Sequence, residues 1–108
     1  MARSRLELQA LLERIMSEFA DDGKKRVWFE PQSSVYLSYP CIVYKLESKD
    51  HLLANNGKYR TMGKYSVTVI DPDVESMLPD RIEELPYCRF DRSFAVDALE
   101  HTIFTLYY

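Results

Sequence analysis

One stretch in the middle of the chain constrains the fold more than any other. Residues 65–70 read Tyr-Ser-Val-Thr-Val-Ile, so bulky side chains alternate with small polar ones. Alternation with period two is typical of a β-strand that turns one face to a core. Asp71-Pro72-Asp73 follows at once, and its proline lacks the backbone N–H that a strand interior needs. The sequence therefore predicts a β-sheet whose strands have sharply marked ends.

The N-terminal segment has helical periodicity instead. Apolar side chains recur at helical spacing within residues 5–21, which predicts an amphipathic helix. These side chains are Leu8, Leu11, Leu12, Ile15, Met16 and Phe19. Ser4 and Glu7 fit a capping box at its start, and Gly23 can take a left-handed conformation after its end. We expect this helix to lie on the sheet, and contact with a helix of another chain is the alternative.

Five strands and a second helix complete the expected order. The patterns predict strands over residues 27–29, 39–46, 59–70, 87–96 and 100–108, and a short helix over 74–85 with Pro79 in its first turn. Residues 47–58 read as a polar loop that ends in the turn signal Asn55-Asn56-Gly57, and Gly63 is expected to form a bulge or bend. Each pair of adjacent parallel strands needs a crossover connection, usually a helix, and two short helices are too few for a sheet that is parallel throughout. The order α-β-β-β-α-β-β therefore predicts an α+β fold with a mostly antiparallel, twisted sheet.

Size and composition indicate one domain, residues 1–108, because the chain has room for a single modest core and contains no linker or repeat. The net charge of −3 argues against nucleic-acid binding by bulk charge. Cys41 and Cys88 form no C-x-x-C pattern, so we expect both to be reduced and partly buried. No apolar run approaches the roughly 18 residues that cross a bilayer, and we expect the protein to be made in the cytoplasm.

Candidate catalytic and metal-binding residues are sparse. Asp97, Glu100 and His101 would place a histidine near carboxylates, but no nucleophile motif accompanies them, and capping of a turn is the favoured role for Asp97. Four potential zinc ligands lack the close pairing that zinc sites show. They are Cys41, His51, Cys88 and His101. We expect no catalytic residue, no metal and no cofactor, and a small cytosolic enzyme or metal-binding domain is the alternative.

Three carboxylates crowd into five residues at Asp71, Asp73 and Glu75. A calcium-binding loop needs a longer series of oxygen ligands and a glycine at its turn, and that glycine is missing. We therefore expect the aspartates to cap the second helix. With three glycines in all and no phosphate-binding motif, a phosphate site is not expected.

Several stretches of the chain, in a fixed order, carry a resemblance to a known family. They are residues 38–46 (SYPCIVYKL), 65–73 (YSVTVIDPD), 84–86 (ELP) with Cys88 and 90–92 (FDR), 97–101 (DALEH) and 104–108 (FTLYY). As a set they resemble small bacteriophage proteins of the head–tail junction, of the tail-terminator or tail-completion type. The chain departs from the family pattern at residues 98–100, where an Asn is expected before Leu99 and another near Glu100.

The resemblance implies a structural virion protein without catalysis. Such a protein is an α+β domain, six copies of which close into a ring at the head-proximal end of the tail tube. The ring ends tube growth, meets the head connector with its other face, and lets the DNA pass through its lumen. A neck, stopper or adaptor protein of the same connector is the alternative role.

In such a ring, two different patches on each chain must complement each other. Two groups of residues are candidates for functional surfaces of the ring. Carboxylates expected to face the lumen and repel the passing DNA are Asp71, Asp73, Glu75, Glu83 and Glu84. Residues expected at interfaces are Trp28, Lys49, Lys58, Arg60, Lys64 and Tyr107. The four cations of this second group lie in segment 47–64, which we expect to become ordered on assembly.

Overall fold

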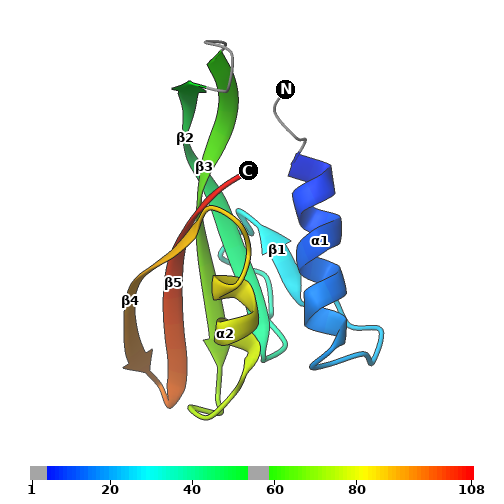
Figure 1. The fold of residues 1–108 in the computed structure, drawn as a ribbon. Coiled ribbons are helices and arrows are strands. Elements are labelled where there is room, and N and C mark those ends of the chain that lie inside the picture. The colour runs from blue at the N-terminus through cyan, green and yellow to red at the C-terminus, as the bar shows by residue number, and fades with distance from the viewer. Residues whose placement is uncertain (1–4, 54–58) are drawn as a thin grey trace.

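The computed structural model describes the backbone of residues 5–53 and 59–108, and the side chains of residues 5–49 and 62–108. Its elements follow one another in the predicted order (Figure 1). They are α1 (Arg5–Ser17), β1 (Val27–Phe29), β2 (Cys41–Leu53), β3 (Tyr59–Asp71), α2 (Leu78–Glu83), β4 (Cys88–Val96) and β5 (Leu99–Tyr107). The α+β fold class is confirmed.

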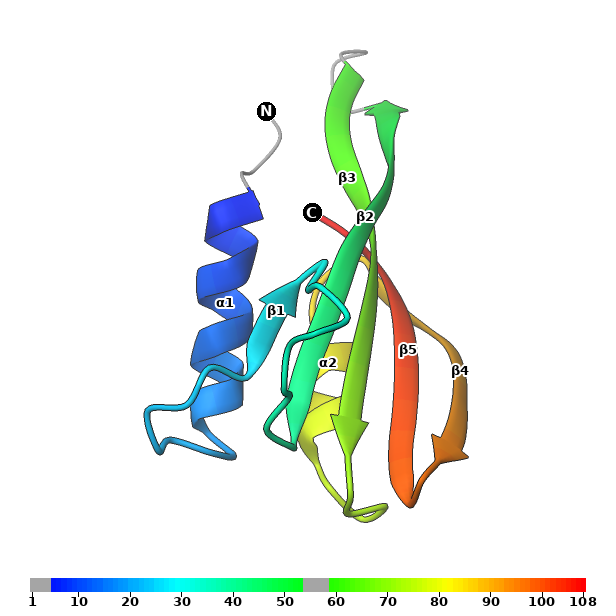
Figure 2. The ribbon, with the colours of Figure 1, turned by 180° about the vertical axis from the view of Figure 1, so that it is seen from behind.

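The strands form one five-stranded sheet in the order β1-β2-β3-β5-β4. Only β1 and β2 run parallel, and the other three neighbouring pairs are antiparallel. Both helices lie on the same side of the sheet, and α1 packs along β1 while α2 lies near β4 and the lower half of the sheet (Figure 1). Seen from behind, the other side of the sheet carries neither helix (Figure 2).

The core lies between the two helices and the side of the sheet that they cover. α1 contributes Leu8, Leu12, Ile15 and Met16, and α2 contributes Leu78 and Ile82. The predicted alternation in β3 is confirmed, since Tyr65, Val67 and Val69 are buried against the helices and the residues between them face the other way. Each fully buried Leu or Ile contributes roughly 1.5–3 kcal/mol to folding. The fold therefore rests on this one-sided core.

The predicted polar loop over residues 47–58 is wrong for residues 47–53, because these residues continue β2. The expectation that segment 47–64 becomes ordered on assembly stays a prediction. β2 continues to Leu53 and pairs with β3 from Tyr59 onward, which makes a long hairpin. The chain after β5 stays beside β3 as far as Gly63, which exchanges two backbone hydrogen bonds with Tyr108. The part of the hairpin beyond Gly63 borders no third strand among the described residues (Figure 1). Without a sheet neighbour, this part lacked the alternation that marks a half-buried strand. The turn signal at residues 55–57 lies outside the described residues.

The bulge predicted at Gly63 lies on the opposite strand. The register of β2 shifts between Leu46 and Ser48, so Glu47 is the extra residue, whereas Gly63 is paired with Lys49. Gly63 is required for space instead. A Cβ added there would lie 2.6 Å from Cε2 of Tyr65 and 3.1 Å from Cδ1 of Leu46. The glycine lets the Tyr65 ring fold over the strand.

Both helices are shorter than predicted. α1 ends at Ser17, and Gly23, although left-handed with φ +80°, lies six residues further on, so it is not the helix terminus. α2 begins at Leu78 rather than at residue 74, with Pro79 in its first turn as predicted. Residue 4 lies outside the described residues, and the expected capping box lies there in part. Asp97 lies in a turn, as expected, because Asp97 and Ala98 connect β4 to β5 with φ values of 53° and 62°.

Candidate functional site

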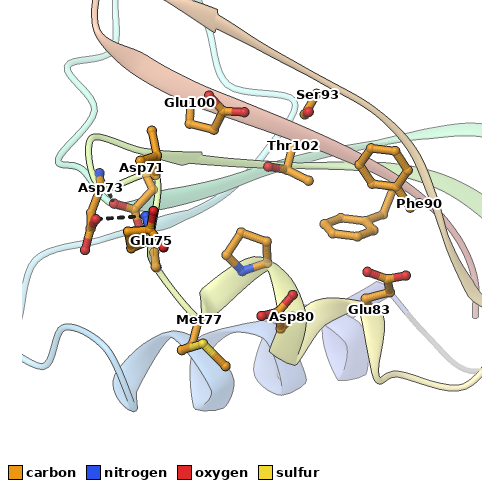
Figure 3. A pocket seen from close by; sticks show the side chains of 14 residues that line it. Asp71, Asp73, Glu75, Met77, Asp80, Glu83, Phe90, Ser93, Glu100 and Thr102 are labelled. Carbon is orange, nitrogen blue, oxygen red and sulfur yellow. Dashed lines mark hydrogen bonds between the residues drawn. The ribbon is translucent and has the colours of Figure 1, made fainter.

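A pocket of about 350 Å³ lies on the helix-covered side of the sheet, between α2 with the loop before it and the strands β4 and β5 (Figure 3). Phe90 and Phe104 form part of its apolar wall, with their ring centroids 6.1 Å apart. Six carboxylates line it, and we call it the acidic pocket. They belong to Asp71, Asp73, Glu75, Asp80, Glu83 and Glu100.

The structure brings together four of the five carboxylates that were expected to face a lumen, and it leaves out Glu84. Glu84 instead accepts a hydrogen bond from Arg81 at 3.2 Å. Sequence reasoning missed Asp80 and Glu100 as members of this group. The strand period contained a usable signal for Glu100, because residues 100, 102 and 104 of β5 all point to the same side of the sheet.

The loop before α2 is shaped by its own aspartates. The Asp71 carboxylate, buried at the end of β3, accepts a hydrogen bond from the backbone N–H of Asp73 at 2.8 Å. Asp73 accepts one in the same way from the N–H of Glu75 at 2.9 Å. An Asp side chain that accepts a hydrogen bond from the backbone N–H two residues further on forms a turn by itself. Two such turns fix the shape of this loop. The prediction that these aspartates cap α2 is wrong, because its N-cap is Met77, which forms no side-chain cap.

The charges of the acidic pocket are not neutralised within the described part of the chain. The ion pairs found there join Arg81 to Glu18 and Glu84, Asp22 to Lys24 and Arg26, and Arg92 to Asp91. The hydrogen bond from Arg26 lowers the pKa of Asp22 to about 2. None of the six pocket carboxylates takes part in these pairs. The pocket is therefore a concentrated negative surface beside an apolar wall.

The side of the sheet that faces away from the helices is a second candidate surface, which we call the open face. One row of paired residues across it reads Lys45, Ser66, Thr105 and Arg89. The next row reads Trp28, Val43, Thr68, Ile103 and Arg92. Lys64 and Tyr107 form a further pair above them. The open face thus has four cations around small polar and apolar side chains.

Three of the six predicted interface residues fall on the open face, namely Trp28, Lys64 and Tyr107. Lys49 is exposed on the hairpin, and the side chains of Lys58 and Arg60 lie outside the described residues. Trp28 is half-buried, with the Lys25 ammonium 4.4 Å from its ring centroid. Its indole N–H is buried without an acceptor among the described residues.

β4 is an edge strand with unusual exposure. Eight of its nine residues are exposed, and Cys88 is half-buried. Phe90 is 47% exposed, Phe94 41% and Val96 47%. The Phe94 ring stacks on His101 with centroids 4.9 Å apart. Large apolar side chains that remain exposed on a free edge indicate a surface that another chain can cover.

The residues considered for catalysis and zinc binding are not brought together. Glu100 and His101 are consecutive in β5 and so point to opposite sides of the sheet. Cys88 packs against the core, whereas Cys41 and His101 lie on the open side and are separated by β3, a spacing of roughly 10 Å. Burial raises the pKa of Cys41 to about 12 and that of Cys88 to about 11. The side chain of His51 lies outside the described residues.

A comparison with models of known protein families found no match, and a comparison with curated proteins found none either. Within the described residues, no group of three or more His, Cys, Asp and Glu side chains is arranged to hold a metal ion. Neither of the described helices has the length and apolar character that crossing a membrane requires. The acidic pocket and the open face are therefore the features from which a function can be inferred.

Proposed function

We propose that this protein is a structural component of a bacteriophage head–tail junction, a tail terminator whose copies close into a ring, six by the family resemblance. The observation that carries the proposal is the one-sided core. Helices cover one side of the sheet, the other side carries neither helix (Figure 2), and the edge strand β4 leaves Phe90 and Phe94 exposed. Surfaces of this kind are typical of a protein whose fold is completed by neighbouring copies.

The placement of the resembling stretches also supports the proposal. Residues 38–46 include the start of β2, and residues 65–73 include the end of β3. The remaining stretches fall at the end of α2, on β4 and on β5. Segments far apart in sequence therefore lie on neighbouring strands of one sheet. They form a continuous structural unit, as expected if the resemblance reflects one common fold.

In the proposed ring, those of the five predicted lumen carboxylates that the neighbouring copy leaves uncovered face the lumen, where negative charge repels the passing DNA and keeps it mobile. The partners are other copies of this chain, the tail-tube protein and the head connector, and the protein resides at the head–tail junction of the virion. No reaction, cofactor or metal belongs to this role. A map of the assembled ring that placed the pocket carboxylates on its outer wall would contradict the lumen assignment.

Mass determination by light scattering, combined with negative-stain imaging, tests the proposed function. Purified protein, alone and mixed with tail tubes, is expected to give rings or capped tube ends of uniform diameter. A protein that stays monomeric at high concentration and leaves tube ends bare would refute the proposal. Binding to the connector but not to tubes would assign the neck or stopper role instead.

The metal-binding alternative has its own test. Metal analysis of the purified protein is paired with the double substitution Cys41→Ser and Cys88→Ser. Assembly that is unchanged by the substitution, in protein without bound zinc, argues against a zinc domain. Stoichiometric zinc that is lost with the cysteines would favour that alternative over the structural role.

A further inference from the structure

We propose that the open face of one copy docks onto the acidic pocket of the next copy. The inference deepens the proposed function, on which it rests, by naming the two surfaces that meet between neighbouring subunits. The partner is a second copy of this chain, held by opposite charges around an apolar centre. Three observations carry it: the charge of the open face, the unpaired charge of the pocket, and their positions on opposite sides of one sheet.

The open face carries a group of basic side chains. Lys45, Arg89 and Arg92 are exposed, and Lys64 is half-buried beside Tyr107. The paired positions of these rows are otherwise occupied by Ser, Thr, Val, Ile, Trp and Tyr, and the carboxylates beside the rows belong to Glu47 and Asp91, the extra residues of two bulges. Arg92 has a loose contact with Asp91, at 4.0 Å, and the other three cations form no ion pair with a described residue. Four positive charges thus frame a half-buried, partly apolar patch.

The acidic pocket offers the complementary arrangement. It holds six carboxylates that form no ion pair within the described residues, together with the exposed edge of Phe90. Thr102 adds a second sign that the pocket receives a ligand. Its side chain is more than nine-tenths buried and lines the pocket (Figure 3), and it forms no hydrogen bond with another described residue. A cationic side chain entering the pocket would meet these carboxylates and the Thr102 hydroxyl.

The two surfaces point in different directions. Consecutive residues of β5 alternate between them, since Thr102 and Phe104 line the pocket while Ile103 and Thr105 lie on the open face. A contact between different surfaces of identical chains is head-to-tail, and it closes into a ring when the rotation between copies allows it. Docking in this way would also cover Phe94 and Val96, which lie on the open side of β4.

A second copy fits these observations better than nucleic acid does. DNA would match the basic open face alone and would leave the acidic pocket unmatched, on a chain whose net charge is −3. The chain itself carries both complementary surfaces. Charges arranged in this way set register and partner choice more than raw affinity. The docking is therefore expected to be specific and sensitive to charge reversal.

Charge exchange tests the docking. One variant reverses the open face with Arg89→Glu and Arg92→Glu. Another reverses the pocket with Glu75→Lys and Glu83→Lys, whose side chains accept no hydrogen bond from a described residue. Each variant alone is expected to associate at least tenfold more weakly than the wild type, by sedimentation velocity. An equal mixture is expected to recover association, because the reversed face of one variant complements the reversed pocket of the other.

The controls separate the possible causes. Arg14→Glu with Asp21→Lys changes exposed charges away from both surfaces and is expected to leave association unchanged. Circular dichroism checks that each variant is folded. Binding to labelled duplex DNA is measured in parallel at low salt. DNA binding that is lost in the Arg89/Arg92 variant while its assembly persists would assign the open face to nucleic acid and overturn the docking.

The outcomes distinguish the docking from the proposed function. If the wild type forms rings and either folded variant forms them equally well, the docking is wrong while the ring remains. If two folded variants fail to associate when mixed, the two surfaces do not meet each other and the docking is again wrong. If the wild type forms no ring even at tube ends, the proposed function fails, and the docking fails with it.

Discussion

At the scale of single residues, Gly63 is required because the ring of Tyr65 lies where its side chain would be. Gly63→Ala would place a Cβ 2.6 Å from Cε2 of Tyr65, closer than real contacts allow. Tyr65 is 6% exposed and has little room to move. We expect the substitution to lower the free energy of unfolding by about 1–3 kcal/mol, a usual cost of overpacking. Chemical denaturation followed by fluorescence measures it.

Repeating Gly63→Ala in a protein that lacks the Tyr65 ring separates a steric clash with that ring from backbone strain at Gly63. In Tyr65→Val the ring is absent, so adding Gly63→Ala should cost much less than it does in the wild type. Gly23→Ala is the matched control, because Gly23 has φ +80° with no atom within 4 Å of an added Cβ. Its cost arises from conformation alone, about 1–2 kcal/mol. An equal cost of Gly63→Ala in both backgrounds would show that Tyr65 is not the cause.

The two cysteine thiols give the fold a pH dependence at the alkaline end. Burial raises the pKa of Cys41 to about 12 and that of Cys88 to about 11, whereas an unfolded cysteine titrates near pH 8.5. The folded state therefore binds more protons than the unfolded state between those values. Stability is fully present below about pH 8.5 and falls as the pH rises toward the folded pKa values. Urea denaturation between pH 8 and 10.5 is expected to show this decline.

Substitution of Cys41 tests whether its thiol causes the loss of folding stability at alkaline pH. Burial also raises the pKa values of Tyr44 and Tyr65, so part of the loss above pH 10 belongs to them. Cys41→Ala is expected to flatten the slope between pH 8.5 and 10, where the tyrosines contribute little. A slope unchanged by the substitution would mean that Cys41 ionises as easily in the fold as in the unfolded chain.

At the scale of elements, the sequence predicted helices and strands best where a segment buries one of its sides. β3 was found because Tyr65, Val67 and Val69 alternate with polar residues, and α1 because four of its apolar side chains reach the core. The extension of β2 to Leu53 was missed because the hairpin there borders no third strand among the described residues. The bulge at Glu47 depends on pairing with β3, which no local pattern encodes.

α2 has two kinds of contact with the rest of the domain, and they are expected to differ in energy. Arg81 donates two hydrogen bonds to Glu18, just beyond α1, at 2.9 and 3.0 Å, but both side chains are partly exposed. Arg81→Ala should therefore lower the free energy of unfolding only slightly. The adjacent Ile82 is fully buried, so Ile82→Ala should cost about 2–5 kcal/mol. Thermal and urea unfolding of the two variants compares them.

Salt provides the control for the comparison of Arg81 and Ile82. The cost of Arg81→Ala should shrink further at high salt, which screens exposed charges, while that of Ile82→Ala should not. A larger loss from Arg81→Ala than from Ile82→Ala would mean that the ion pair, rather than packing, holds α2 in place.

At the scale of the whole molecule, the candidate site was only partly predictable. Asp71, Asp73 and Glu75 are near one another in sequence, so their clustering was visible. Glu100 joins them because β5 lies next to β3 and pairs Glu100 with Asp71, a contact between residues far apart in the chain. The open face was not predicted as a unit, since its cations come from Lys45, Lys64, Arg89 and Arg92 on three strands. Strand order, which periodicity does not fix, decides both surfaces.

One side of the sheet is covered by the helices and the other is not. Substituting one phenylalanine on each side compares their contributions to folding and to association. Phe104 is 1% exposed in the core, so Phe104→Ala is expected to cost about 3–5 kcal/mol of folding stability and to lose assembly by unfolding. Phe94 is 41% exposed on the open side of β4, so Phe94→Ala should cost about 1 kcal/mol or less. It should nevertheless weaken association, because the docked copy would cover its ring. Urea denaturation and sedimentation velocity on the same samples separate the two effects, and a Phe94→Ala protein that assembles like the wild type would mean that β4 stays exposed in the ring.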